Sequence, residues 1–218
     1  SEINLEVFCA LGSQAAVAIE NASVYKRLRD AFIHTTESLA AAIDSRDPYT
    51  GDHTRRVADY SVRLADNLNL SKQEKEELRL AAILHDIGKI GIDDAILRKG
   101  GALSEKEELM MKGHPEIGAR ILGSVEEMRN VISGVRYHHE RFDGKGYPDG
   151  LKGEEIPLYA RIISIADAYD ALTTDRPYKK AVDKDAALEE IAKDKSLRFD
   201  PFIVDTFYRI MKLETKDR

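Results

Sequence analysis

Five of the six histidines in this chain, together with aspartates near them, form a set of residues suited to binding metal ions. In chain order the set is His53, His85, Asp86, His114, His138, His139 and Asp167. The pairs His85-Asp86 and His138-His139 each follow an apolar stretch, residues 80–84 and 131–135. A carboxylate buried at such a place is costly unless a cation compensates it, and neutral imidazole is the commonest metal ligand. The pattern therefore indicates a metal site.

Imidazole and carboxylate ligands from separate helices can hold two cations that share one carboxylate. Such a pair of cations activates a water molecule and stabilises the charge that develops on a phosphate. Asp86 suits the shared position because His85 beside it can bind one metal directly. Asp167 and Asp170 lie three residues apart in one predicted helix, so chemistry alone leaves either as the last ligand. His34 stands apart from this set and is expected on a helix surface.

Almost the whole chain is predicted to be helical, which makes the fold class all-α. Helix-capping residues are expected at Asp52, Ser71, Ser104 and Asp200. Ser71 and Ser104 each have a glutamate three residues later, which completes a capping box. Helices are expected over residues 53–68, 72–86, 104–113, 158–172, 184–194 and 201–212. The segment 142–157 is rich in glycine and proline and cannot be helical.

A long periodic segment, residues 3–44, comes before these helices. Its apolar stripe runs through Phe8, Leu11, Ala15, Ala18, Ala22 and Tyr25, weakens at Arg29 and resumes at Phe32, Leu39 and Ile43. This spacing suits a two-stranded helical connector, and equally a single helix packed on its own domain.

Composition and charge limit the partners and the cellular compartment that are expected for this protein. The chain of 218 residues has a net charge of −6 and lacks a basic stripe, so no DNA partner is expected. Its single cysteine, Cys9, excludes an intrachain disulfide and suits a reducing compartment. No apolar run is expected to reach the roughly 18–20 residues that span a bilayer, and no secretory signal is recognised. These features predict a cytoplasmic protein without direct membrane insertion.

Two segments resemble the motifs that give the HD-GYP family its name. They are His85-Asp86-Ile87-Gly88-Lys89 and the run from His138-His139 to Gly146-Tyr147-Pro148. The likeness covers about residues 32–212 and continues through residues 156–158, 160–162, 166–167 and 176–179. The HD-GYP family is a branch of the HD-domain metal-dependent phosphohydrolases that acts on the bacterial messenger cyclic di-GMP. The resemblance implies an all-α HD-type domain that opens cyclic di-GMP to linear pGpG and continues more slowly to GMP.

The resemblance also implies a set of metal ligands. The first metal is implied to bind His53, His85, Asp86 and Asp167, and the second to bind Asp86, His114, His138 and His139. Asp167 is favoured over Asp170 because the family's aspartate follows the same alanine. Some members recruit a third metal with a glutamate four residues before the first histidine, where this chain has Tyr49. Two divalent ions are therefore expected, Fe or Mn in the first place, with Co, Ni or Zn as alternatives.

Cations near these motifs are implied to bind phosphate. Lys89 is implied to contact the scissile phosphate or the bridging hydroxide, and Arg176 and Lys179 match the family's other phosphate-binding cations. A guanidinium suits bidentate phosphate contact.

The Gly-Tyr-Pro loop invites two interpretations, and both are kept. Gly146 permits close approach of the backbone to a ligand and Tyr147 offers an aromatic face, while the loop also positions His138-His139. Residues 195–198 depart from the glycine-led approach to Phe-Asp-Pro that is common in the family, which is expected to alter a loop without touching the metals.

Residues 10–22 resemble the terminal helix of a GAF sensory domain. The implied organisation is the end of an upstream GAF-like domain and a coiled-coil-like connector in residues 1–31, then the phosphohydrolase domain in residues 32–218. A homodimer through the connector and regulatory protein partners are expected. Two alternatives remain: a receptor that binds cyclic di-GMP without turnover, and an HD phosphohydrolase for another cyclic dinucleotide.

Overall fold

This computed structural model describes residues 2–44, 46, 52–123, 128–175 and 180–216. Within these ranges the chain forms helices and loops, with no strand and one isolated bridge between Lys195 and Phe199. The predicted all-α class is confirmed. The chain divides into two compact units, Ser1–Ser38 and Leu39–Arg218.

Helix α1 (Glu2–Asp44) forms the first unit and continues into the second, close to the range predicted for it. Within the first unit the apolar stripe is exposed: Phe8, Leu11 and Tyr25 keep 77%, 63% and 71% of their surface accessible. The helix passes residue 31 without a break, so the domain boundary proposed there stays a prediction.

The expectation that no stretch matches a membrane span in length and composition was wrong. The part of α1 from Val7 to Ile43 is long and apolar enough, with a mean hydropathy of 1.3 over its most apolar 18 residues. Glu20 is the single charged residue among residues 7–24. Several residues of this stretch are alanines, which are less apolar than leucine or isoleucine, so the stretch does not stand out as an apolar run. Length and composition alone are weak evidence, because apolar helices that pack against protein meet the same criterion.

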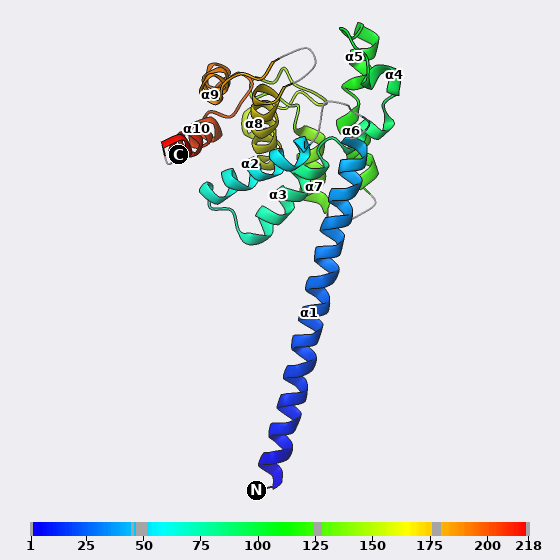
Figure 1. Cartoon of the computed structure of the whole chain (residues 1–218), viewed down its shortest axis with the longest axis vertical. Coiled ribbons are helices and arrows are strands. Elements are labelled where there is room, and N and C mark those ends of the chain that lie inside the picture. The colour runs from blue at the N-terminus through cyan, green and yellow to red at the C-terminus, as the bar shows by residue number, and fades with distance from the viewer. Residues whose placement is uncertain (1, 45, 47–51, 124–127, 176–179, 217–218) are drawn as a thin grey trace. The chain divides into compact units, whose positions relative to one another are not determined.

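The second unit is a bundle of helices with short connecting segments. Its longer helices are α2 (His53–Asn67), α3 (Lys72–Leu84), α6 (His114–Leu122), α7 (Arg129–Tyr137), α8 (Leu158–Thr173), α9 (Lys184–Lys193) and α10 (Pro201–Lys216). Shorter pieces are α4 (Asp94–Leu97), α5 (Glu105–Met111) and the 3₁₀ turns η1 (Ile87–Gly91) and η3 (Gly153–Glu155). Helix α8 packs against α2, α7 and α9, while α3 packs against α2 and α7 (Figure 1).

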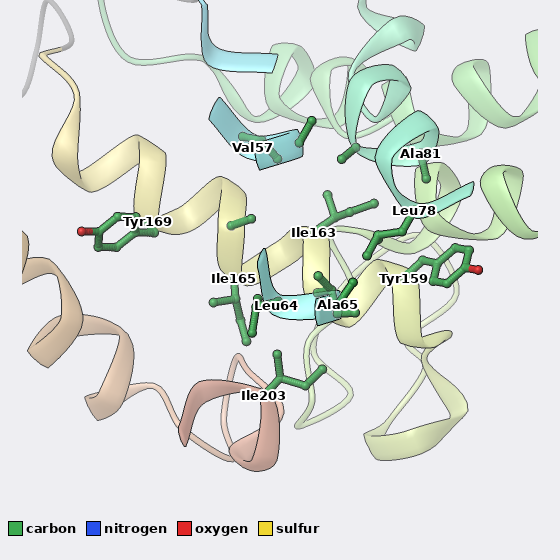
Figure 2. Close-up of a cluster of buried hydrophobic side chains, with 14 of the residues drawn as sticks. Val57, Leu64, Ala65, Leu78, Ala81, Tyr159, Ile163, Ile165, Tyr169 and Ile203 are labelled. Carbon is green, nitrogen blue, oxygen red and sulfur yellow. The ribbon is translucent and has the colours of Figure 1, made fainter. Parts of the chain in front are cut away.

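Helix α8 is central because it is apolar on most of its surface, as expected of a helix surrounded by other helices. Its residues Ile162, Ile163 and Ile165 are fully buried. Figure 2 shows Ile163 and Ile165 close to Leu64 of α2, with Ile203 of α10 below them. Each such side chain contributes about 1.5–3 kcal/mol to folding on burial. This core holds rigid the helices that carry the histidines.

Most of the predicted helix caps are confirmed. Ser71 and Ser104 complete capping boxes, and the Asp200 carboxylate accepts hydrogen bonds from the backbone N–H groups of two residues at the start of α10. Asp52 is a correction: it has a left-handed backbone (φ 57°) and its side chain does not cap α2. A capping side chain needs extended backbone at its own residue to reach the helix N–H groups, and Asp52 lacks it.

Candidate metal centre

The predicted metal ligands lie mostly at helix ends. His53 is the first residue of α2 and His114 the first of α6, while His85 and His138 end α3 and α7. At a helix end the backbone leaves its regular path, so side chains of consecutive residues can face the same point. Asp167 is the exception and projects from within α8. The four histidines are buried, with at most 3% of their surface exposed.

Two groups of potential ligands result, and Asp86 connects them. His53, His85 and Asp86 offer ligand atoms within 4.8 Å of one another, and so do His114, His138 and His139. Asp86 Oδ1 lies 3.1 Å from His114 Nε2, and Asp86 Oδ2 lies 3.4 Å from His85 Nε2. The carboxylate therefore turns one oxygen toward each group.

Three of the histidines are oriented by the helix that each of them ends or follows. The Nδ1 atoms of His85, His114 and His138 lie 2.7, 2.8 and 2.7 Å from the carbonyl oxygens three residues earlier. A carbonyl only accepts hydrogen bonds, so Nδ1 carries a proton, and Nε2 is the nitrogen that faces the centre.

The inward-facing nitrogens fit a metal ion. His85 Nε2 is buried and has no hydrogen-bond partner among the described residues. The Nε2 atoms of His114 and His138 face each other at 3.4 Å. Buried acceptors without donors are costly, and a cation coordinated between them would remove that cost.

His53 is oriented differently, by a carboxylate. Its Nδ1 lies 2.6 Å from Asp170 Oδ2, and its Nε2 lies 3.4 Å from Asp167 Oδ1. Arg56 donates to both oxygens of Asp170, through Nε and through Nη2. Burial alone would raise the pKa of Asp170, but the hydrogen bonds from His53 and Arg56 lower it, so the carboxylate remains charged. Asp167 thus faces the centre and Asp170 lies behind His53.

The site also perturbs the pKa values of its own residues. Burial would raise the pKa of Asp86, but the Lys89 ammonium and the His85 imidazole hold it well below its usual range. Burial would lower the pKa of His85, but the Asp86 carboxylate raises it to about 9. Burial, aided by repulsion from His85 and His114, lowers the pKa of His138 to about 3. One carboxylate and one cationic imidazole therefore balance each other beside neutral ligands.

Lys89 brings a second cation to Asp86. Its Nζ lies 2.8 Å from Asp86 Oδ2, one turn further along η1. The turn fits closely against α6, because a Cβ added at Gly88 would lie 1.8 Å from the His114 carbonyl oxygen. Glycine at this position therefore lets the segment with Lys89 approach the helix that begins at His114.

The Gly-Tyr-Pro loop covers the His139 side of the centre. The Tyr147 ring stacks on the His139 ring with 4.9 Å between centroids, and the Tyr147 N–H donates to the His139 carbonyl at 3.3 Å. Burial raises the pKa of Tyr147, so the phenol stays protonated. A Cβ on Gly146 would lie 2.3 Å from the backbone nitrogen of Arg141, so the loop folds back closely on itself. Residues 142–157 form no α-helix, as predicted, although three of them form the 3₁₀ turn η3.

Arg176 and Lys179, predicted to bind phosphate, lie outside the described residues, and so does Tyr49. Three further residues support the centre: Arg56 and Glu140, which were not predicted from the sequence, and Asp170, which was considered there only as an alternative ligand. Arg56 and Asp170 orient His53, and the buried Glu140 accepts the N–H groups of Asp149 and Gly150 at 2.8 and 2.9 Å. A glutamate directly after the histidine pair was the available signal for Glu140, whereas nothing in the local sequence pairs Arg56 with Asp170.

The chain is similar to known proteins in sequence and in fold. A family model described as the HD domain matches residues 37–203. The cyclic di-GMP phosphodiesterase response regulator RpfG of Xanthomonas campestris is 45% identical over 177 residues, which cover 80% of this chain and 47% of that protein. The 3'3'-cGAMP-specific phosphodiesterase 3 of Vibrio cholerae is 37% identical over 190 residues, 87% of this chain and 41% of that protein.

A solved structure, described as a cyclic GMP-AMP specific phosphodiesterase of V. cholerae (V-cGAP3), superposes with a TM-score of 0.59 at 21% identity. The match covers 81% of this chain and 48% of that one, and it supports the fold. This chain therefore spans less than half the length of each of these relatives.

Proposed function

Because this chain belongs to the HD-domain family, we propose that it is a metal-dependent phosphodiesterase that opens cyclic di-GMP to linear pGpG. The observation that carries the proposal is the position of Asp86, whose two oxygens face two groups of buried imidazoles. Relatives named for cyclic di-GMP phosphodiesterase activity support the choice of substrate.

We propose two divalent ions, Fe or Mn in the first place and Co, Ni or Zn as alternatives. His53, His85, Asp86 and Asp167 would hold one, and Asp86, His114, His138 and His139 would hold the other. The inward Nε2 lone pairs and the position of Asp86 between the two groups support this number. When bound, the metals supply Lewis acidity to a water nucleophile and to the phosphate.

The side chains around the ligands then have distinct tasks. Lys89, 2.8 Å from Asp86, is placed to stabilise negative charge that builds on the phosphate oxygens during cleavage. Tyr147 and Glu140 hold the loop that backs His139, which keeps that imidazole in one orientation. Arg176 and Lys179 would bind the second phosphate, a role that rests on the sequence resemblance.

Product analysis tests the proposal. Protein purified under reducing conditions and loaded with Mn²⁺ or Fe²⁺ is incubated with cyclic di-GMP, and the products are separated by chromatography. The variant Asp86→Ala is expected to form no pGpG. Asp66→Ala is the matched control, because Asp66 is an exposed aspartate that pairs with Lys75 on the surface.

Each outcome has a separate meaning. Formation of pGpG by the wild type and by Asp66→Ala, but not by Asp86→Ala, supports the proposal. Binding of cyclic di-GMP without turnover by the metal-loaded protein would contradict it and favour a receptor. Faster cleavage of 3'3'-cGAMP than of cyclic di-GMP would assign the protein to the second substrate class, which the 37% identity to a cGAMP-specific relative makes a specific rival.

We also propose that α1 pairs with the α1 of a second copy. Its exposed stripe, with Phe8 at 77% and Leu11 at 63% accessible, supports pairing because apolar side chains spaced by three and four residues form coiled-coil seams. Light scattering is expected to give a dimer for the wild type and a smaller species for Leu11→Glu with Tyr25→Glu. Equal masses would contradict the pairing.

A further inference from the structure

A cavity of about 470 Å³ opens beside the proposed metal ligands, between α8 and the end of α9. We name it the α9 cavity and define it by His139, Asp167, Leu172, Asp194, Arg198 and Phe199. Its volume falls in the range of roughly 300–1,000 Å³ that is usual for small-molecule sites. Since His139 and Asp167 form part of its wall, a group attached to a phosphate at the metal centre would enter it.

Arg198 reaches this cavity from a loop that is held on both sides. Its N–H donates to the Asp194 carbonyl at 2.9 Å, and its carbonyl accepts the Phe142 N–H at 3.2 Å. The neighbouring Leu197 carbonyl accepts the Asp143 N–H at 2.8 Å. The loop therefore bridges the end of α9 and the Gly-Tyr-Pro segment, and its backbone position is fixed.

The guanidinium of Arg198 is available to a ligand. It lies 5.1 Å from the centroid of the Phe199 ring, and it makes no hydrogen bond or ion pair with another described residue. A guanidinium that is stacked but not hydrogen-bonded keeps its forked set of N–H donors for a planar acceptor.

Two carboxylates in the same cavity argue against an anion as the occupant. Asp194 and Glu190 both line it, and neither forms an ion pair with Arg198 in the described part of the chain. A phosphate placed there would meet their negative charge. A neutral planar group with acceptors on one edge and donors on another would satisfy both kinds of side chain.

Guanine has this pattern. Its N7 and O6 accept hydrogen bonds, and arginine binds that pair in bidentate fashion, while its N2 amino group donates. Adenine offers a donor, its N6 amino group, where guanine offers O6, so the arginine fork would face a second donor.

We propose that the α9 cavity is a guanine subsite, in which Arg198 binds O6 and N7 and Asp194 accepts from the opposite, donor edge. The inference rests on the proposed phosphodiesterase function and specifies how the substrate is selected. Arg198 is then a specificity-determining residue. It lies in the loop where the sequence departs from the common family pattern, and that departure shapes the substrate site.

Kinetics with two substrates test the subsite. The value of kcat/KM is measured for cyclic di-GMP and for cyclic di-AMP with the metal-loaded wild type, Arg198→Lys, Arg198→Gln and Asp194→Asn. Arg198→Gln is expected to lower kcat/KM for cyclic di-GMP by roughly 10–100-fold and to leave cyclic di-AMP nearly unchanged, and Arg198→Lys, which keeps a donor for O6 and N7, is expected to lose less. Lys184→Gln is the control, since Lys184 is an exposed cation at the start of α9 that does not line the cavity.

A second measurement separates the subsite from the catalytic proposal. Calorimetry gives the Kd of GMP and of AMP, which differ only in the base, for each variant. If the wild type prefers GMP to AMP and Arg198→Gln removes that preference, the subsite is supported. A wild type that binds in this way but cleaves no dinucleotide would refute only the proposed phosphodiesterase activity. Equal losses for both bases in Arg198→Gln would overturn the guanine assignment in favour of a phosphate contact. Unchanged binding and kinetics in all variants would overturn it altogether. Circular dichroism verifies that each variant is folded.

Discussion

The two ends of the candidate metal centre are built in different ways. At one end His114 and His138 donate Nδ1–H to carbonyl oxygens three residues earlier in the chain. At the other end His53 is held by Asp170, a carboxylate 117 positions away that Arg56 also contacts. Orientation by a backbone carbonyl requires only the helix end that supplies that carbonyl. Orientation of His53 by Asp170 requires a buried negative charge and a cation to balance it.

The difference has a chemical consequence. A carboxylate partner raises the basicity of an imidazole ligand more than a neutral carbonyl does, and it fixes the ring more firmly. The proposed metal beside His53 should therefore be bound more tightly than the one beside His138, so the two positions should fill in order.

Removing the residue that joins the two ends should have the largest effect. Asp86→Asn keeps the size of the side chain but removes the charge that faces His114, His85 and Lys89. Activity is expected to fall to background, and metal content measured by mass spectrometry should decrease at both positions. A fully loaded and active Asp86→Asn protein would show that the two ends are independent.

Asp170→Asn should affect one end alone. It keeps a hydrogen-bond partner for His53 but loses the charge, and support of this kind is worth roughly 10–100-fold in metal affinity or activity. Chelator titration should show weakened binding of the tighter metal, while the weaker one is unchanged. Equal weakening of both metals would mean that Asp170 stabilises the fold rather than one position, and a thermal unfolding curve would register that loss.

Gly88→Ala should disturb the carbonyl-held end through packing. The added methyl group would meet the His114 carbonyl at 1.8 Å and the Gly118 nitrogen at 2.6 Å, both backbone atoms. Overpacking of this kind costs about 1–3 kcal/mol of unfolding free energy. Denaturant titration measures the loss. Gly101→Ala is the matched control, because nothing lies within 4 Å of its added methyl group; an equal loss there would contradict a steric cause.

Metal binding is also expected to depend on pH. Burial lowers the pKa of His85, but the Asp86 carboxylate outweighs that effect and raises it to about 9. The charged His85 therefore stabilises the metal-free fold fully below pH about 6.5, and this stabilisation is lost as the pH rises through about 9. Metal must displace that proton, so affinity should rise by about tenfold per pH unit below pH 9. Melting temperatures with and without Mn²⁺ across this range measure the gain. A pH-independent gain would show that His85 does not bind the metal.

Local interactions explain what could be predicted from sequence. The capping boxes at Ser71 and Ser104 join residues three apart, and both were predicted correctly. Asp52 was predicted wrongly, since its left-handed backbone prevents its side chain from capping α2. Chemistry could not separate Asp167 from Asp170, because which of them faces the centre is set by how α8 packs against α2.

The sequence by itself determined the histidines and aspartates of the candidate centre, the helices that carry them and the glycine-rich loop beside them. Each of these depends on residue type or on contacts within a few positions. Only the tertiary structure decided that Asp170 supports His53 from behind, that Gly88 lies against α6 and that Arg198 points into a cavity beside Asp167. Those relations join distant segments, and they exist only once the core around α8 has brought the helix ends together.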